Sequence, residues 1–353
     1  SILFNNKSKI RKKWLNEFSK DIFELKKKNK QIIIVSSGAI ALGCEQLKLK
    51  KNKLKLDKSQ AVASVGQIEL MNIYKKFFSK NKIKVSQILL TLDDTEQRRR
   101  SINARRTIEN LLAMGIVPII NENDTTATTE IKYGDNDRLA SRVSQIIGAD
   151  CLILLSDVNG LYTKNPKFNK NSSLIKKVSK IDQNIENYSS KFVNDYGSGG
   201  MATKIEAAKI CQLCGCYMVI ANGIKNRPIK EIIKNNNCTW FIPKLSKLDA
   251  RKKWIIGSVQ PKGSLVIDMG AISALKNGKS LLPAGIKLVE GNFNKGDHLK
   301  IIGINKKEYA RGLSSFSSTE INKIIGAQSS QISKLLGYEA KSEVIHKDDM
   351  VEV

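Results

Sequence analysis

The feature that most constrains the fold is a repeated alternation of short apolar strands with amphipathic helices. The first of these strands is a mainly apolar run rich in β-branched residues, like strands that a parallel sheet buries on both faces, and the pattern then repeats. The pattern predicts strands at Gln31–Val35, Val85–Leu90, Ile116–Ile120, Cys151–Leu155 and Tyr217–Ala221, and helices at Lys9–Lys28, Thr95–Met114, Asp135–Ile147 and Lys204–Cys214. This alternation predicts an α/β fold with an open, mainly parallel sheet sandwiched by helices.

The pattern changes after about Pro243, where short strands and closely spaced turns replace the long helices. Strands are predicted at Gly263–Asp268, Gly285–Val289 and Asp297–Gly303. We therefore predict a large domain over residues 1–240, a linker over 241–262 and a small β-rich domain over 263–345.

The net charge of +27 is compatible with two kinds of surface. It could attract nucleic acid or an anionic membrane, or it could simply be spread over solvated faces. The lysine-rich window Lys48–Lys58 is predicted to be a surface loop. Because the charge is dispersed and few aromatic residues accompany it, we favour solvated faces.

Composition also indicates the compartment. Apolar residues make up 41% of the chain, but no apolar run approaches the roughly 20 residues that span a bilayer. Ser1–Asn16 contains no apolar core of a secretion signal. The six cysteines lie mostly in apolar or helical segments, which fits reduced thiols. We predict a cytoplasmic protein that does not contact membranes.

Glycine and serine follow the first predicted strand. The turn Ser36–Ile40 (SSGAI) could leave backbone N–H groups available to an anion, because it precedes a predicted helix. It could equally be a tight turn with a serine N-cap. This turn alone therefore does not decide between a binding site and a structural turn.

Two clusters of acids and amides are harder to explain as capping turns. Asn121–Asp124 (NEND) follows a buried strand, where four polar residues are costly unless they are hydrogen-bonded or bind a ligand. Gly134–Asp137 (GDND) opens a helix and could be caps, but beside the first cluster it would form an acidic pocket. Such a pocket suits an ammonium group, Mg²⁺ or the lysines of a phosphoryl-transfer site. It fits an EF-hand poorly, because the bidentate glutamate is missing.

A glycine-rich loop, Gly197–Lys204 (GSGGMATK), enters a predicted helix. Such a loop can wrap phosphates with backbone N–H groups, and its lysine adds a cation, although it lacks the order of a Walker A loop. A flexible surface loop is the alternative. Cys211, Cys214 and Cys216 have no histidine or fourth cysteine nearby, so we predict buried structural thiols and no metal site.

These segments occur in the order and at the spacing of the glutamate 5-kinases of the amino acid kinase family. The resemblance rests on VSSGAI (35–40), VPIINENDTTA (117–127), KYGDND (132–137), LLSDVNGLYTKNP (154–166) and GSGGMATK (197–204). Two tail segments, SLLPAGIKLVEGNFNKGD (280–297) and GYEAKSEVIHKDDM (337–350), resemble the PUA domain attached to many bacterial members. The glycine loop is shared widely in the family, whereas INEND with GDND is typical of the glutamate-specific members.

The resemblance implies a catalytic domain over 1–240 that phosphorylates the side-chain carboxylate of glutamate with ATP and Mg²⁺, the first step of proline synthesis. Ser37 would contact glutamate. Asp124 and Asn136 would bind it too, with Glu122 and Asp135 nearby. The acids would hold its ammonium group directly or through neighbours. Since the attacking carboxylate is already ionised, the step needs positioning and charge neutralisation rather than a general base.

The resemblance also assigns the nucleotide site. Ser156 and Asp157 match the family's ATP-binding Thr-Asp pair, with serine replacing threonine. Asp137 would orient catalytic lysines, and Lys204 would lie at the transferring phosphoryl group. The nucleotide loop would consist of Ser198, Gly199, Gly200, Met201, Ala202, Thr203 and Lys204. Family members are homo-oligomers, so a homo-oligomer is expected here.

Three expectations stay open. The family begins with a strand ending Lys-x-Gly-[ST]-Ser, and Ser1 matches only its last residue. We expect a longer natural chain, and weak activity and poor stability for a chain that truly starts at Ser1. RNA binding through the PUA domain is the alternative function from another class. A third possibility is an amino acid kinase acting on acetylglutamate, aspartate, carbamate or UMP, although a free ammonium group fits the acids better.

Overall fold

The computed structural model describes residues 2–5, 9–49, 54–127, 135–164, 166, 169, 171–190, 200–235, 237–244, 246 and 261–352. The chain divides into two compact units, residues 1–246 and 247–353, which are described separately. Among the described residues, no helix is both long enough and apolar enough to span a membrane.

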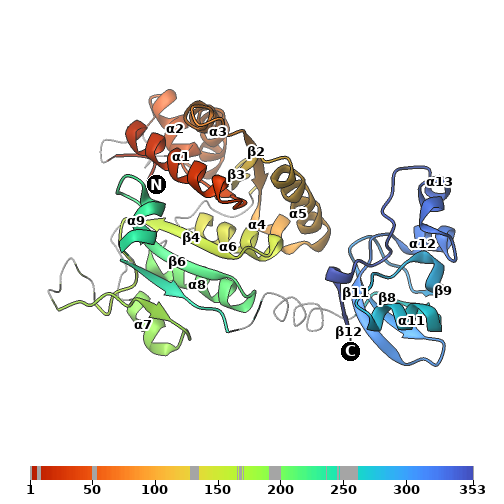
Figure 1. Ribbon diagram of the computed structural model, residues 1–353. Coiled ribbons are helices and arrows are strands. Elements are labelled where there is room, and N and C mark those ends of the chain that lie inside the picture. The colour runs from red at the N-terminus through yellow and green to blue at the C-terminus, as the bar shows by residue number, and fades with distance from the viewer. Residues whose placement is uncertain are drawn as a thin grey trace. The chain divides into compact units, whose positions relative to one another are not determined.

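The described strands of the first unit form two sheets with helices around them (Figure 1). One sheet has the order β1-β3-β2 and is parallel; its strands are β1 (Ile34–Val35), β2 (Val85–Leu90) and β3 (Val117–Glu122). The other has the order β4-β6-β7-β5; its strands are β4 (Cys151–Ser156), β5 (Lys177–Val178), β6 (Tyr217–Asn222) and β7 (Cys238–Phe241). Only the β6–β7 pair is antiparallel. The predicted α/β class with mainly parallel strands is therefore confirmed.

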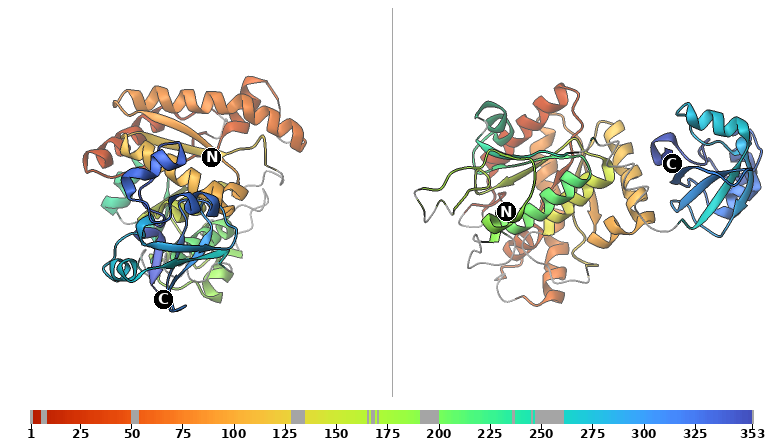
Figure 2. Two further views of the ribbon diagram at one scale, coloured as in Figure 1. Left: turned by 90° about the vertical axis from the view of Figure 1, so that its right-hand side faces the viewer. Right: turned by 90° about the horizontal axis from the view of Figure 1, so that it is seen from below.

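Nine helices are described in this unit. They are α1 (Lys12–Lys27), α2 (Ala39–Gln46), α3 (Leu56–Ser79), α4 (Leu92–Glu96), α5 (Arg98–Ala113), α6 (Asp135–Ile147), α7 (Gln183–Ser190), α8 (Met201–Leu213) and α9 (Pro228–Asn235). Helices α6 and α8 pack side by side, as Figures 1 and 2 both show. This packing brings the first turns of two helices that carry predicted site residues within reach of each other.

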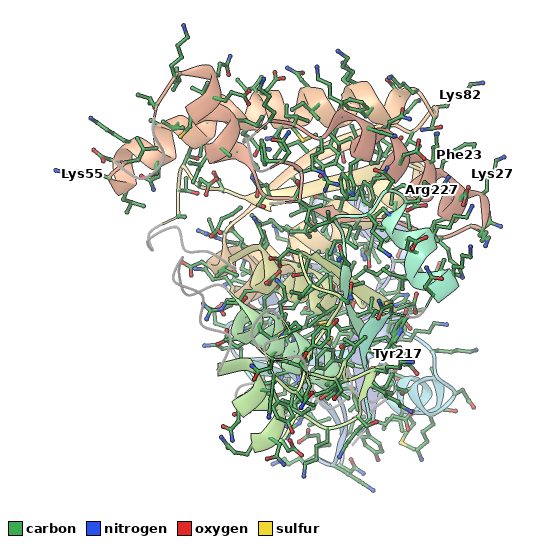
Figure 3. All side chains as sticks on the ribbon, turned by 90° about the vertical axis from the view of Figure 1, so that its left-hand side faces the viewer. Phe23, Lys27, Lys55, Lys82, Tyr217 and Arg227 are labelled. Carbon is green, nitrogen blue, oxygen red and sulfur yellow. The ribbon has the colours of Figure 1, made fainter. Side chains whose placement is uncertain are left out.

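Helix α3 differs most from the sequence prediction. Its 24 residues were not predicted as a helix, and Leu56 begins it within the window assigned to a surface loop. Lys55 and Lys82 lie just beyond its two ends (Figure 3). Glycine lets α2 approach α3 closely, because a Cβ on Gly66 would lie 1.8 Å from the Ala39 carbonyl oxygen.

A second difference is a break in the predicted helix Thr95–Met114. The chain forms α4 and α5 instead, separated at Gln97, whose ψ of 114° is extended. A capping box formed by Thr91 and Asp94 fixes the start of α4: the Thr91 hydroxyl accepts from the Asp94 N–H, and the Asp94 carboxylate accepts from the Thr91 N–H.

One hydrophobic core joins the two sheets of the first unit. It contains Ile34 and Ile119 from one sheet and Val219 from the other, together with aromatic residues of α1 and α3. Trp14 stacks on Phe18 with ring centroids 5.0 Å apart, and Phe18 meets Phe78 of α3 edge-on at 6.2 Å. Burial of these rings anchors α1 and α3 against the sheets.

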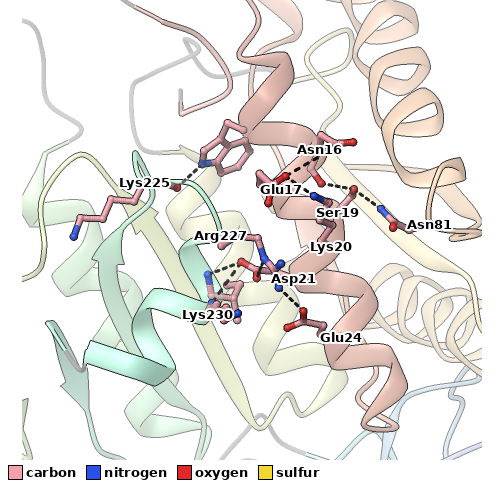
Figure 4. A network of polar contacts seen from close by, with 12 residues as sticks. Asn16, Glu17, Ser19, Lys20, Asp21, Glu24, Asn81, Lys225, Arg227 and Lys230 are labelled. Atoms are coloured by element: carbon pink, nitrogen blue, oxygen red, sulfur yellow. Dashed lines mark hydrogen bonds and ion pairs between the residues drawn. The ribbon is translucent and has the colours of Figure 1, made fainter.

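Polar contacts also join α1 to the chain that follows β6 (Figure 4). The Trp14 indole N–H lies 2.7 Å from the Gly223 carbonyl oxygen. Asp21, with a side chain only 1% exposed, accepts from Arg227 Nε at 2.6 Å and from the Ile229 backbone N–H at 2.9 Å. Asp21 therefore caps the N-terminus of α9 from another helix.

The second unit is built on one five-stranded sheet of order β12-β11-β10-β8-β9. Its elements are β8 (Gly263–Ile267), α11 (Met269–Lys276), β9 (Ile286–Glu290), β10 (His298–Gly303), β11 (Glu308–Leu313), α12 (Ser318–Ile324), α13 (Ile332–Leu336) and β12 (Met350–Glu352). The predicted β-rich character is confirmed. The sequence prediction missed β11 and β12 as well as the three helices.

Candidate functional site

The first pair of interest joins α6 to α8. Lys204 Nζ lies 2.7 Å from Asp137 Oδ2, and the two side chains are 14% and 17% exposed. The Thr203 hydroxyl is 3.0 Å from the same carboxylate oxygen and 3.0 Å from the Gly200 carbonyl oxygen. Asp137 therefore holds the lysine ammonium group in the first turns of α8, just after Gly200.

The ends of β1 and β3 meet beside each other. Val35 is paired with Ile120, and the Ser36 N–H donates to the Ile120 carbonyl oxygen at 2.9 Å. Ser36 and Ser37 thus lie next to the start of the NEND cluster. Gly38 follows with φ +126°, a conformation that glycine adopts readily, and it occupies the N-cap position of α2.

The β3 strand runs further than predicted. It includes Asn121 and Glu122, and both are buried, at 3% and 9% exposure. The Asn121 amide donates to Gln67 Oε1 of α3 at 2.9 Å. Asp124 is half-buried in the turn that follows the strand.

Asn136 lies in the first turn of α6, one residue before Asp137. Its Oδ1 is buried and accepts no hydrogen bond from the described part of the chain. A buried amide oxygen without a donor costs about 1–3 kcal/mol, so it is a candidate to accept a hydrogen bond from a ligand. Asp135 begins α6, but its side chain lies outside the described residues.

The end of β4 carries the other predicted pair. Ser156 is 7% exposed, and its hydroxyl lies 3.2 Å from Oδ1 of the exposed Asp157. The Gly223 N–H donates to the Ser156 carbonyl oxygen at 2.8 Å. Ser156 and Asp157 therefore lie beside the end of β6 in the second sheet.

Comparisons with known proteins follow the same division of the chain. The model of the amino acid kinase family matches residues 1–222, and the model of the PUA domain matches residues 263–336. The chain belongs to the amino acid kinase family. It is 67% identical over 353 residues to the glutamate 5-kinase of Pelagibacter ubique, covering 100% of this chain and 96% of that protein.

Other relatives of this chain carry the same name, glutamate 5-kinase. A glutamate 5-kinase of Sinorhizobium fredii is 47% identical over 351 residues, which cover 99% of this chain and 89% of that protein. Among solved structures, the UMP kinase of Ureaplasma parvum aligns with a TM-score of 0.43 and 16% identity, covering 65% of this chain and 88% of that one.

The predicted nucleotide loop is described only in part. Ser198 and Gly199 lie outside the described residues, while Gly200 is the residue before α8. Met201 and Thr203 are buried and Ala202 is exposed. Met201 packs into a core cluster of this kinase-family domain, so its side chain stabilises the start of α8.

Sequence reasoning missed three residues around the strand ends, namely Gln60, Gln67 and Tyr74. All three lie on α3, and each hydrogen-bonds to a strand end or the turn after it. No motif marks them, because their partners are 38 to 67 positions away in sequence.

The cysteines of this family member form no disulfide. A hydrogen bond to Cys216, together with burial, raises the pKa of the Cys214 thiol. The described residues contain no group of three or more His, Cys, Asp or Glu that could hold a metal ion.

Proposed function

We propose that this chain transfers the γ-phosphoryl group of ATP to the side-chain carboxylate of L-glutamate, forming L-glutamyl 5-phosphate in the first step of proline biosynthesis. The observation that carries this proposal is the 67% identity, along the whole chain, with a protein named glutamate 5-kinase. The fixed lysine of α8 and the polar ends of β1 and β3 support it.

The reaction needs little proton chemistry. Glutamate's side-chain carboxylate is ionised at neutral pH and can attack the γ-phosphorus in line. What the protein must supply is positive charge near the phosphoryl oxygens and a fixed geometry. Lys204 is proposed to supply the charge. Asp137, 2.7 Å from its Nζ, is proposed to keep it in place.

Glutamate is proposed to bind at the adjoining ends of β1 and β3 and at the start of α6. Ser37, Asp124 and Asn136 are the proposed contacts, with Glu122 and Asp135 contributing negative charge nearby. The buried Oδ1 of Asn136 supports this assignment, since an ammonium group would provide the donor that it lacks among the described residues. A free α-ammonium group is the part of glutamate that such acids and amides recognise.

ATP is proposed to bind Ser156 and Asp157 at the end of β4 and the loop from Ser198 to Lys204. Mg²⁺ would bind with ATP and neutralise phosphate charge. It usually needs only one or two carboxylates besides phosphate oxygens, and the exposed Asp157 fits that role. The acyl phosphate product hydrolyses readily, so the site must exclude water during the reaction.

A substrate panel tests this proposal. ADP release is measured with Mg-ATP and, in turn, L-glutamate, N-acetylglutamate, aspartate, carbamate and UMP. We expect glutamate to be preferred over each alternative by at least about a hundredfold in kcat/KM, because N-acetylglutamate, carbamate and UMP lack the α-ammonium group that the proposed contacts recognise and aspartate has a shorter side chain. Preference for another member of the panel would reject glutamate as the substrate.

A second proposed activity is contact with RNA through residues 263–336, which match the PUA domain. The net charge of +27 would favour phosphate binding. Gel shifts with bulk tRNA at several salt concentrations test it, and absence of a salt-dependent shift would reject it.

We also propose a homo-oligomer and a cytoplasmic location. The lack of disulfides among the six cysteines supports the latter.

A further inference from the structure

Helix α3 carries a column of polar side chains on the face that packs against the rest of the first unit. Gln60, Gln67 and Tyr74 are spaced seven residues apart, which places them one above another on the same side of the helix. The neighbouring buried positions, such as Leu70 and Phe77, are apolar. A buried polar group in an apolar helix face is costly unless it has a specific partner.

Each member of the column contacts a segment that carries proposed glutamate contacts. The Tyr74 hydroxyl donates to Ser36 Oγ at 2.9 Å. Gln67 Oε1 accepts from the Asn121 amide at 2.9 Å, and Gln60 Nε2 donates to the Ala127 carbonyl oxygen at 2.9 Å. One rigid helix therefore touches the end of β1, the end of β3 and the turn beyond it.

The Tyr74 contact leads directly to Ser37. Ser36 Oγ, which accepts the hydrogen bond from Tyr74, is itself 3.2 Å from the Ser37 carbonyl oxygen and can donate to it. Tyr74 is 3% exposed, so water cannot replace the phenol hydroxyl. Burial raises the pKa of Tyr74 to about 12, so the hydroxyl remains a donor at any working pH.

The Gln67 contact orients the NEND segment. Gln67 is 8% exposed and Asn121 is 3% exposed, so their amide–amide hydrogen bond is shielded from solvent. Asn121 immediately precedes Glu122 in the strand. A change in the Asn121 side chain would therefore shift the backbone from which Glu122 and Asp124 project.

We propose that Tyr74 and Gln67 are positioning residues for the amino-acid substrate. They set the spacing between Ser37 at the end of β1 and the Asn121–Asp124 segment at the end of β3. Tyr74 acts through Ser36, and Gln67 acts through Asn121. This inference rests on the proposed function, because it assigns these residues to glutamate binding rather than to the nucleotide site.

The test separates positioning from stability by comparing KM values for the two substrates. In the Tyr74→Phe variant, the loss of one shielded hydrogen bond should raise KM for glutamate about three- to tenfold. KM for ATP should stay within about twofold. Gln67→Met should act in the same direction, since methionine keeps the length of the side chain but removes its amide.

Two control variants test for a general effect of losing a side-chain hydrogen bond. Tyr338→Phe removes the same hydroxyl in the second unit, where it donates to Glu320 at 2.7 Å. Gln212→Met removes an amide on α8 that donates to the carbonyl oxygens of Val178 and Ile242. Both controls should leave KM for glutamate unchanged, even where they lower the melting temperature.

A double-mutant cycle tests whether Tyr74 acts through Ser36. Ser36→Ala should raise KM for glutamate about as much as Tyr74→Phe, and the double variant should be no worse than either. Additive effects, an unchanged KM for glutamate, or equal rises in both KM values would overturn the inference. If Tyr74→Phe does not fold, Ser36→Ala and Gln67→Met decide the matter. A wild-type chain inactive with glutamate would instead reject the proposed function.

Discussion

Replacing Asp21 by alanine should destabilise the first unit by about 3 kcal/mol, at the low end of the cost of breaking a buried ion pair. The side chain is 1% exposed and accepts from Arg227 Nε at 2.6 Å and from the Ile229 backbone N–H at 2.9 Å. Its loss removes a helix cap worth about 1 kcal/mol and leaves a guanidinium with one partner fewer. Arg227 keeps Glu24 at 2.6 Å, which is why the low end of the range applies.

Urea unfolding followed by circular dichroism measures the change in the free energy of unfolding, and a thermal melt measures the change in melting temperature. For a unit of this size, about 3 kcal/mol corresponds to a fall of about 6–12 °C in melting temperature. Glu24→Gln is the matched control, because Glu24 binds the same Arg227 but is 53% exposed. The control should cost under about 1 kcal/mol, as exposed ion pairs do. A cost for Asp21→Ala no greater than that of Glu24→Gln would refute the argument that burial makes this contact strong.

Three further predictions concern the proposed active site, the packing of helices and the pH dependence of stability. Lys204→Ala should lower kcat about 10²–10³-fold. The control Lys209→Ala removes a surface lysine of α8 that pairs with Glu186 at 2.5 Å, and it should leave kcat unchanged. Equal kcat values for the two variants would reject the role of Lys204. Gly66→Ala should lower the free energy of unfolding by at least about 1–3 kcal/mol, because the new Cβ would meet the Ala39 carbonyl oxygen. Gly270→Ala in α11 is the control: the nearest atom to its new Cβ would be 3.4 Å away, so thermal melts should show a neutral or stabilising change. Because burial raises the pKa of Tyr74 to about 12, above its ordinary value of 10, the folded state holds this proton more tightly than the unfolded chain. Its contribution to stability is complete below pH 10 and is lost as pH rises towards 12, so unfolding of Tyr74→Phe should depend less on pH in that window; identical profiles would contradict the assignment.

The α/β class could be predicted because buried parallel strands leave an unmistakable apolar pattern. Ile116–Ile120 is such a run, and it forms most of β3. Helix α3 left no comparable pattern, since its core face mixes apolar residues with Gly66, Gln67 and Tyr74. The start of α4 did have a local signal, the Thr91–Asp94 capping box, which the sequence analysis overlooked.

The candidate site could likewise be predicted from the sequence only in part. Residues of the NEND, GDND and GGMATK segments stand out locally, because clustered acids and glycines are unusual at strand ends and helix starts. The contacts that hold them do not, because they depend on which helix packs on which strand. Asp137 and Lys204 are 67 positions apart, and Gln67 and Asn121 are 54 apart. Only the three-dimensional packing of α3, α6 and α8 brings these pairs together.

The most direct test of the proposed reaction is to trap its product. The chain is incubated with Mg-ATP, L-glutamate and hydroxylamine, which converts an acyl phosphate into a hydroxamate that forms a coloured complex with Fe³⁺. The proposed reaction predicts γ-glutamyl hydroxamate in proportion to the ADP released, and almost none with Lys204→Ala. ADP release without hydroxamate, or an equal yield from the Lys204→Ala variant, would contradict it.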